Sequence, residues 1–188
     1  MKKTKIFFTY LFFATIFLNA QNNNSQLNTV NIEHYKLTIE VNDKNDSIKA
    51  SMAVHLKFKK STSSFYLNLE NLDTISGKGM QVASVFQNKI LVEFKHQNNK
   101  LQITPQHNFP NLPYTYTITY KGIPKDGLII GKNIHGDRTF FGDNWPNRAH
   151  HWFPCIDHPS DKATIEYYIK APNYYQTIAN GFQVEETN

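Results

Sequence analysis

The residues that could do chemistry gather in one segment, 131–159. This segment holds four of the eight histidines, both arginines, both tryptophans, the single cysteine and three prolines. It is too polar and too often interrupted by proline to form a single strand. Loops carried on a rigid scaffold are where binding and catalytic side chains concentrate. The segment therefore raises three possibilities: metal ligation, thiol catalysis and substrate binding.

Metal ligation is suggested by His150, His151, Asp157 and His158, which all carry ligand atoms. Their spacing lacks the i, i+4 histidine pair that places two imidazoles on one helical face. Adjacent His150 and His151 would point to opposite sides of an extended chain. His135 stands alone in the sequence. The spacing therefore predicts no metal site and no cofactor in this chain.

Cys155 is the only thiol in the sequence. Its neighbours Phe153, Pro154 and Ile156 are apolar and suggest burial, which raises the pKa of a thiol and makes it inert. Residues 152–155 either plug one end of the fold or belong to a functional loop, and both interpretations stay open. The sequence contains no GxSxG, P-loop or GxGxxG pattern, so signatures of serine hydrolases and nucleotide-binding proteins are absent.

The run FPCIDHPSDKAT at residues 153–164 follows NRAHHW and precedes a predicted strand and an AP-x-x-Y-x-x-x-ANG tail. This order resembles the signature R-x-x-FPC-x-D-x-P-x-x-K-A-T, which closes the N-terminal domain of the aminopeptidase N family of zinc metallopeptidases. The HYKLTIEV stretch at 34–41 also resembles the opening of that domain. The resemblance covers nearly all of the chain after its first 30 residues.

The resemblance implies a saddle-shaped β-sandwich that packs on a thermolysin-like catalytic domain. That catalytic domain carries the zinc ligands HExxH plus a distant glutamate, and GxMEN, which holds the free amine of the substrate. Neither motif occurs here, since no histidine is followed by glutamate. We therefore expect zinc only in a full-length enzyme, and a peptide substrate bound through a catalytic domain absent from this chain.

The family also places a glutamine or glutamate before its FPC run, where it helps to bind the α-amine of the substrate. Gap-free counting puts that position at Trp145, with a preceding glutamine at Asp143. The sequence departs from the family here, because Trp145 offers only a ring face to an ammonium. Asp143 or Asn144 is the better expected acceptor. The motif residues expected to be structural are Arg148, Phe153, Pro154, Cys155, Asp157, Pro159 and Lys162.

The elements that must position these residues show a two-residue period, and no window of eleven residues carries a helical stripe. Alternation of this kind predicts strands with one face on a core. The predicted strands are 35–41, 48–58, 65–69, 81–86, 90–94, 100–104, 114–120, 139–141, 163–170 and 176–179. Short strands at close spacing predict an all-β, antiparallel, saddle-like β-sandwich over residues 31–188.

The first twenty residues resemble a secretory signal peptide, with a basic start, an apolar run and a small residue, Ala20, at the expected cut. The apolar run is too short to span a membrane, which takes about 20 residues. Residues 21–30 predict a disordered leader. We therefore expect an exported protein, periplasmic or secreted, with no membrane span after cleavage.

The formal net charge of +5 does not indicate nucleic-acid binding. Lys2, Lys3 and Lys5 lie within the predicted signal peptide, and Arg138 and Arg148 are the only arginines. Proteins that bind duplexes usually cluster such residues on one face. We therefore expect no nucleic-acid partner.

The sequence as a whole predicts the N-terminal, substrate-lining domain of an exported zinc aminopeptidase, truncated before its catalytic domain and inactive alone. In the full enzyme, zinc would polarise the peptide carbonyl and activate water. The alternative is a stand-alone secreted β-sandwich that binds or scaffolds without catalysis. An in-frame continuation that encodes HExxH and GxMEN would support the enzyme.

Cys155 provides a direct test of the predicted burial. The native thiol should react slowly with a thiol reagent and quickly in denaturant. Cys155→Ser should lower the free energy of unfolding by roughly 1–3 kcal/mol, because it buries a hydroxyl without an assured partner. Rapid labelling of the native protein would contradict burial and restore a reactive-thiol role.

Overall fold

The computed structural model describes residues 26–187, so the predicted signal peptide at 1–20 lies outside the described residues. The described chain is all-β, as the alternation predicts. It forms eleven strands and a single 3-10 turn, η1 (Ala149–His151), and contains no α-helix. Among the described residues, no helix is long and apolar enough to cross a membrane.

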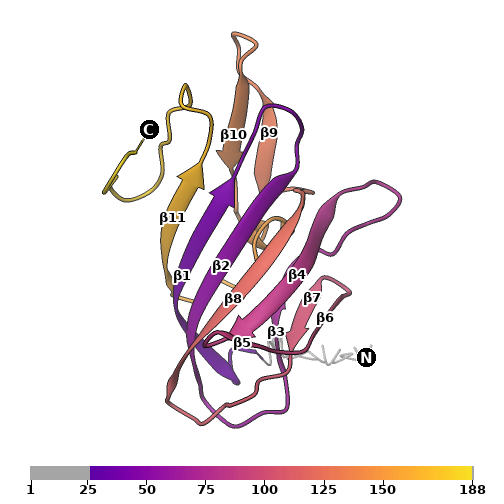
Figure 1. Ribbon diagram of the computed structural model, residues 1–188, viewed down its shortest axis with the longest axis vertical. Helices are drawn as coiled ribbons and strands as arrows, with labels where there is room; N and C mark the ends of the chain where they lie inside the picture. The colour runs from indigo at the N-terminus through magenta and orange to yellow at the C-terminus, as the bar shows by residue number, and fades with distance from the viewer. Residues whose placement is uncertain (1–25, 188) are drawn as a thin grey trace, which may run out of the picture.

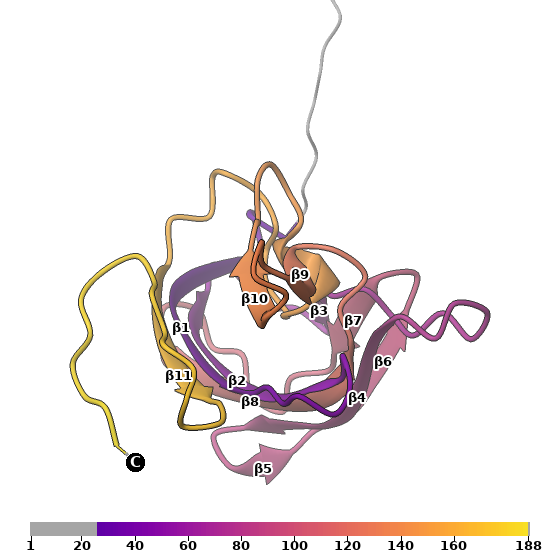
Figure 2. The same cartoon turned by 90° about the horizontal axis from the view of Figure 1, so that it is seen from above.

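The largest layer is a six-stranded sheet with the strand order β11-β1-β2-β8-β4-β5. Its strands are β1 (Val30–Glu40), β2 (Ile48–Phe58), β4 (Gly79–Gln87), β5 (Ile90–Leu91), β8 (Pro113–Ile123) and β11 (Thr164–Lys170). The sheet runs obliquely along the molecule (Figure 1). Seen from above, it curves around the interior like an incomplete barrel (Figure 2).

Two smaller sheets complete the architecture. The three-stranded sheet has the order β3-β7-β6 and the two-stranded sheet pairs β10 with β9. Their strands are β3 (Phe65–Asn68), β6 (Phe94–Gln97), β7 (Lys100–Ile103), β9 (Leu128–Lys132) and β10 (Arg138–Gly142). The β9–β10 hairpin lies across the open side of the curved sheet in Figure 2.

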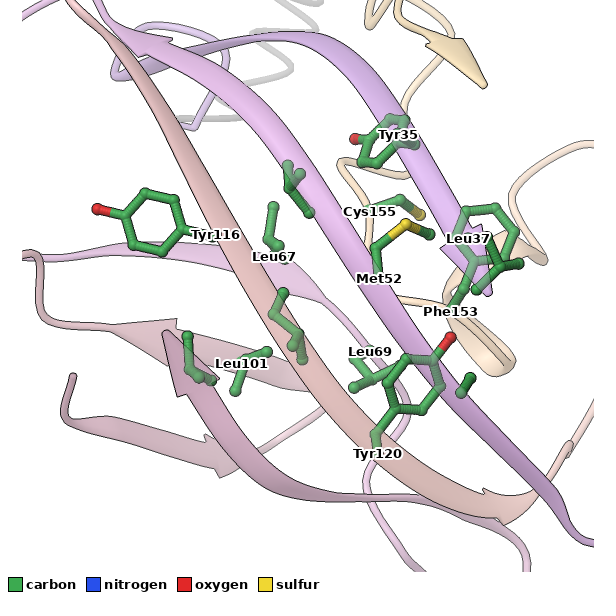
Figure 3. Close-up of a cluster of buried hydrophobic side chains, with 14 of the residues drawn as sticks. Tyr35, Leu37, Met52, Leu67, Leu69, Leu101, Tyr116, Tyr120, Phe153 and Cys155 are labelled. Atoms are coloured by element: carbon green, nitrogen blue, oxygen red, sulfur yellow. The ribbon is translucent and has the colours of Figure 1, made fainter. Parts of the chain in front are cut away.

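The core joins the curved sheet to the three-stranded sheet. Along β2 every second residue is buried, as expected of a strand with one face on a core. Met52 and Tyr116 of the large sheet share one fully buried cluster with Leu67 and Leu101 of the small sheet (Figure 3). Phe65 packs edge-on against Tyr116 with ring centroids 5.0 Å apart, which aromatic quadrupoles favour.

Strand β11 corrects the expectation of a purely antiparallel fold. It pairs in parallel with β1, and Tyr35 lies opposite Ile165. A parallel pair needs a long crossover, because the chain must return to the same end of the sheet before it pairs. The crossover is the segment 143–163 between β10 and β11, which contains most of the chemistry-bearing residues. Alternation within β11 could not reveal this direction.

Three further elements differ from the prediction. The expected strand at 90–94 is divided between β5 and β6, which belong to different sheets. Residues 176–179 form no strand, and Ile178 there is 87% exposed. Strand β9 was not predicted, because LIIGK does not alternate and is stabilised by pairing with β10.

Residues 26–30 are the described part of the predicted leader, and they pack on the domain. Gln26 is buried, and its Oε1 accepts a hydrogen bond from the backbone N–H of Tyr66 at 2.8 Å. Thr29 is also buried, and Val30 begins β1. Because the buried amide has a partner, its burial is tolerated. These described residues therefore pack on the fold, while the leader predicted for residues 21–30 lies in part outside the described residues.

Tyr35 joins β1 to the crossover. Its buried hydroxyl donates to Oδ2 of Asp161 at 2.8 Å and accepts the backbone N–H of Ile156 at 3.1 Å. Figure 3 shows its ring close to Cys155. Burial raises the pKa of the Tyr35 hydroxyl and also that of the Asp161 carboxyl. The protonated hydroxyl thus provides a hydrogen-bond partner for both the Asp161 carboxyl and the backbone N–H of Ile156.

Tyr35→Phe should lower the free energy of unfolding by about 1–3 kcal/mol, because the buried N–H of Ile156 loses its acceptor. Tyr116→Phe is the matched control, since the Tyr116 hydroxyl is buried and has no hydrogen-bond partner among the described residues. The control should be neutral or stabilising. Denaturant unfolding of the three proteins measures both effects. Equal losses in the two variants would show that the Tyr35 hydroxyl does not hold the crossover.

Candidate functional site

The β9–β10 hairpin is locked against the loop that follows it. The carbonyl of Gly127, just before β9, accepts the backbone N–H of Asp143 at 2.7 Å. Gly127 has a φ of +75°, and a Cβ there would lie 2.2 Å from the carbonyl oxygen of Arg148. Glycine is the residue that tolerates both this conformation and this close approach. The position at which the loop 143–148 begins therefore depends on glycine at residue 127.

Arg148 holds this loop from several directions. Its Nη2 lies 2.6 Å from Oδ2 of Asp143, and its Nη1 lies 3.7 Å from Oδ1 of Asp126. Its Nε donates to the carbonyl oxygen of Trp145 at 2.6 Å. Charge-assisted hydrogen bonds from a planar guanidinium are strong and directional. The loop is therefore shaped around one arginine.

The three predicted amine-binding residues share this loop but have different surroundings. Asp143 is ion-paired with Arg148. Asn144 accepts the indole N–H of Trp152 through Oδ1 at 2.9 Å. The side chain of Trp145 is 78% exposed. Of these three residues, Asp143 and Asn144 thus support the loop, and Trp145 is exposed to solvent, as are Pro146 and Asn147 beside it.

The centre of the motif is buried at the end of the sandwich. Its buried residues are Trp152, Phe153, Pro154, Cys155 and Ile156. The peptide groups of Cys155 and Asn68 exchange two hydrogen bonds, of 2.7 and 3.1 Å. Burial raises the pKa of the Cys155 thiol well above its usual range, so the thiol stays protonated and unreactive at neutral pH. This geometry favours the structural interpretation of residues 152–155. Pro159 and Lys162, in contrast, are exposed.

Asp157 fixes the η1 turn and one of its rings. Its Oδ2 accepts the backbone N–H of His150 at 3.1 Å and lies 2.6 Å from Nδ1 of the same residue. Because an ionised carboxylate only accepts hydrogen bonds, Nδ1 of His150 carries a proton. Nε2 is then the nitrogen of a neutral His150 that keeps a free lone pair.

His150 and His151 lie on the same side of the chain, which corrects the expectation that they point apart. That expectation assumed an extended backbone, whereas η1 is a 3-10 turn, and the ring centroids are 4.1 Å apart. Both rings face Glu70, whose side chain is 4% exposed. Glu70 precedes His151 by 81 residues. No local spacing could have identified it as their neighbour.

These features define a class: an all-β sandwich domain whose parallel last strand is reached through a buried FPC-x-D motif. The chain matches the Peptidase M1 N-terminal domain family over residues 31–188, and it belongs to that family. Protein TMA108 of Saccharomyces cerevisiae is 26% identical to it over an alignment of 186 residues. The alignment covers 81% of this chain and 19% of the yeast protein.

Solved structures of M1 zinc metallopeptidases contain the same fold. The enzyme from Deinococcus radiodurans superposes with a TM-score of 0.70 at 21% identity, covering 85% of this chain and 36% of that chain. Yeast LTA4 hydrolase gives a TM-score of 0.70 at 19% identity, covering 86% of this chain and 26% of that chain. The chain therefore corresponds to a minor part of each of these longer proteins.

Gly127→Ala should lower the free energy of unfolding by at least about 1 kcal/mol, because a side chain there combines an unfavourable φ with a backbone clash. Gly131→Ala, on the same hairpin, is the control, since an added Cβ would meet no atom within 4 Å. The control should change stability by no more than about 0.5 kcal/mol. Thermal unfolding distinguishes the two, and equal stabilities would contradict the close packing of the hairpin on the loop.

Proposed function

We propose that this chain is the N-terminal, substrate-lining domain of an exported zinc metallo-aminopeptidase that removes N-terminal residues from peptides. Its membership of the Peptidase M1 N-terminal domain family supports a peptidase domain. A variant of the Deinococcus radiodurans enzyme was solved with a bound Tyr-Ser-Ala substrate, which supports a peptide as the ligand. The basic and apolar residues 1–20 support export to the periplasm or medium.

In this proposal the chain contributes substrate binding rather than bond cleavage. HExxH and GxMEN are absent from the sequence. The ligands of a catalytic zinc would therefore come from a further domain, and no catalytic step is assigned to the residues described. The chain alone is proposed to be inactive.

The observation that carries the proposal is the presentation of Trp145. A large aromatic side chain is 78% exposed, although its own carbonyl is held by Arg148 at 2.6 Å. A sandwich core does not require such a loop. An indole face attracts a cation such as the protonated N-terminus of a peptide. The loop thus suits a substrate ammonium at the edge of the domain.

Asp143 acts in this proposal as a positioning residue. Its Oδ2 is engaged by the Arg148 guanidinium at 2.6 Å, so a substrate amine would compete with this ion pair for the carboxylate. Its loss would loosen the loop and allow Trp145 to move. Asn144 acts in the same way through its hydrogen bond to Trp152. The substrate contact is therefore assigned to Trp145.

In the enzyme that joins this chain to its catalytic domain, Trp145→Ala should raise KM for peptides with a free amine. A cation–π contact contributes at most about 2 kcal/mol, or about 30-fold in KM. Asp143→Ala should raise KM by a smaller factor, because it acts through the loop. Steady-state kinetics on a series of free-amine peptides measures both changes.

Phe141→Ala is the matched control, since Phe141 is also an exposed aromatic, at 62%, on the neighbouring β10. It should leave KM unchanged. Zinc content and melting temperature should be unchanged in Trp145→Ala. If Trp145→Ala and Asp143→Ala both keep the kinetics of the parent enzyme, the loop is only structural and the proposed substrate contact is wrong.

A further inference from the structure

Glu70, His150 and His151 converge beside the motif from distant parts of the sequence, and the proposed function uses none of them. Glu70 follows β3, and the two histidines lie in η1. One ligand atom from each lies within 4.8 Å of the other two. The side chain of Glu70 is 4% exposed, and those of the histidines are 20% and 19% exposed. A buried carboxylate is tolerated only with partners, and the two imidazoles face the oxygen, Oε2, that Lys125 does not contact.

The distances in this cluster suit a tetrahedral metal ion. Oε2 of Glu70 lies 3.1 Å from Nδ1 of His151 and 3.9 Å from Nε2 of His150. Zinc bound at about 2.0–2.2 Å to nitrogen and oxygen places neighbouring ligand atoms about 3.3–3.6 Å apart. The two observed distances bracket this value. All three ligand atoms lie within 4.8 Å of one another, so the side chains would draw together around the ion, and Nδ1 of His151 would lose its proton on binding.

Asp157 supplies the support that metal-bound histidines usually have. It lies 2.6 Å from Nδ1 of His150, so it holds the proton on that nitrogen and leaves Nε2 toward Glu70. Histidines that bind metals almost always donate their other N–H to a carboxylate, carbonyl or water. The backbone is also fixed, because the N–H of Glu70 donates to the carbonyl oxygen of His150 at 2.8 Å.

Lys125 is the one cation that pairs with Glu70 among the described lysines and arginines. Its Nζ lies 2.5 Å from Oε1, the carboxylate oxygen that does not face the imidazoles, and its side chain is 49% exposed. The ammonium can therefore remain near Oε1 or move into solvent when Oε2 binds a metal. A nearby positive charge would still weaken metal binding through repulsion.

We propose that Glu70, His150 and His151 form a binding site for a divalent transition-metal ion, and specifically for zinc. Two imidazoles and one carboxylate are a donor set that zinc accepts, and three protein ligands leave a fourth position for water. Asp157 orients His150 within the site. The ion would clasp the segment after β3 to the η1 turn.

Zinc titration of the purified 188-residue chain against a chromophoric chelator tests the site. The parent chain should bind one zinc per molecule. Glu70→Gln and His151→Ala should each weaken binding at least 10-fold, since each removes a ligand. Zinc should raise the melting temperature of the parent chain and not that of these variants, because a ligand stabilises only the state that binds it.

Two further variants distinguish zinc binding at this site from binding to surface histidines and from a Glu70–Lys125 ion pair that is only structural. His55→Ala is the control, because His55 pairs with His34 at a centroid distance of 5.6 Å without a buried carboxylate. It should leave zinc binding unchanged. Lys125→Met should tighten zinc binding several-fold, because it removes the competing ammonium. If Glu70 served only to form an ion pair with Lys125, Lys125→Met would not be expected to tighten zinc binding.

Three results would overturn the proposal. The first is the absence of saturable zinc binding by the parent chain. The second is binding that falls as much in His55→Ala as in His151→Ala. The third is weaker rather than tighter binding in Lys125→Met. Melting curves of each variant without zinc establish that it is folded before its affinity is compared.

Discussion

The fold depends on the attachment of the crossover between β10 and β11 to the end of the sandwich. β11 can pair in parallel with β1 only after a long return of the chain. A return path that is buried must satisfy its backbone groups. The exchange of hydrogen bonds between Cys155 and Asn68 does so, and the Tyr35 hydroxyl accepts the N–H of Ile156. With these groups satisfied, the apolar run from Trp152 to Ile156 can add to the core.

The electrostatics beside the motif follow from this attachment. The pairing of Asn68 with Cys155 continues two residues later, where the N–H of Glu70 donates to the carbonyl oxygen of His150. This pairing of the backbones buries the Glu70 carboxylate beside the crossover. Ionised groups are tolerated there only with partners, and Lys125 and His151 provide them. Burial lowers the pKa of His151, although Glu70 opposes this shift. The polar cluster is thus a consequence of how the crossover is held.

Local alternation predicted the strands that form the core, because one buried face imposes a two-residue period on β1, β2 and β8. It could not predict the parallel direction of β11, which depends on the path of the preceding segment. It also could not show that His150 and His151 lie on one side of the chain, because nothing in their local sequence distinguishes a 3-10 turn from an extended backbone. Glu70 lay beyond any local pattern. The motif identified the family and the position of the loop, while the different surroundings of Asp143 and Trp145 required tertiary structure.

The exposed loop and the polar cluster are linked through η1. Trp152 follows His151 directly, and its indole N–H holds Asn144 in the loop that presents Trp145. A loop fixed in this way loses little conformational freedom when a ligand binds, so more of the contact energy appears as affinity. Side chains that share one rigid turn do not respond independently to substitution. We therefore expect changes at Glu70 to reach the loop through η1, so that the position of the exposed Trp145 ring depends on a charge buried behind it.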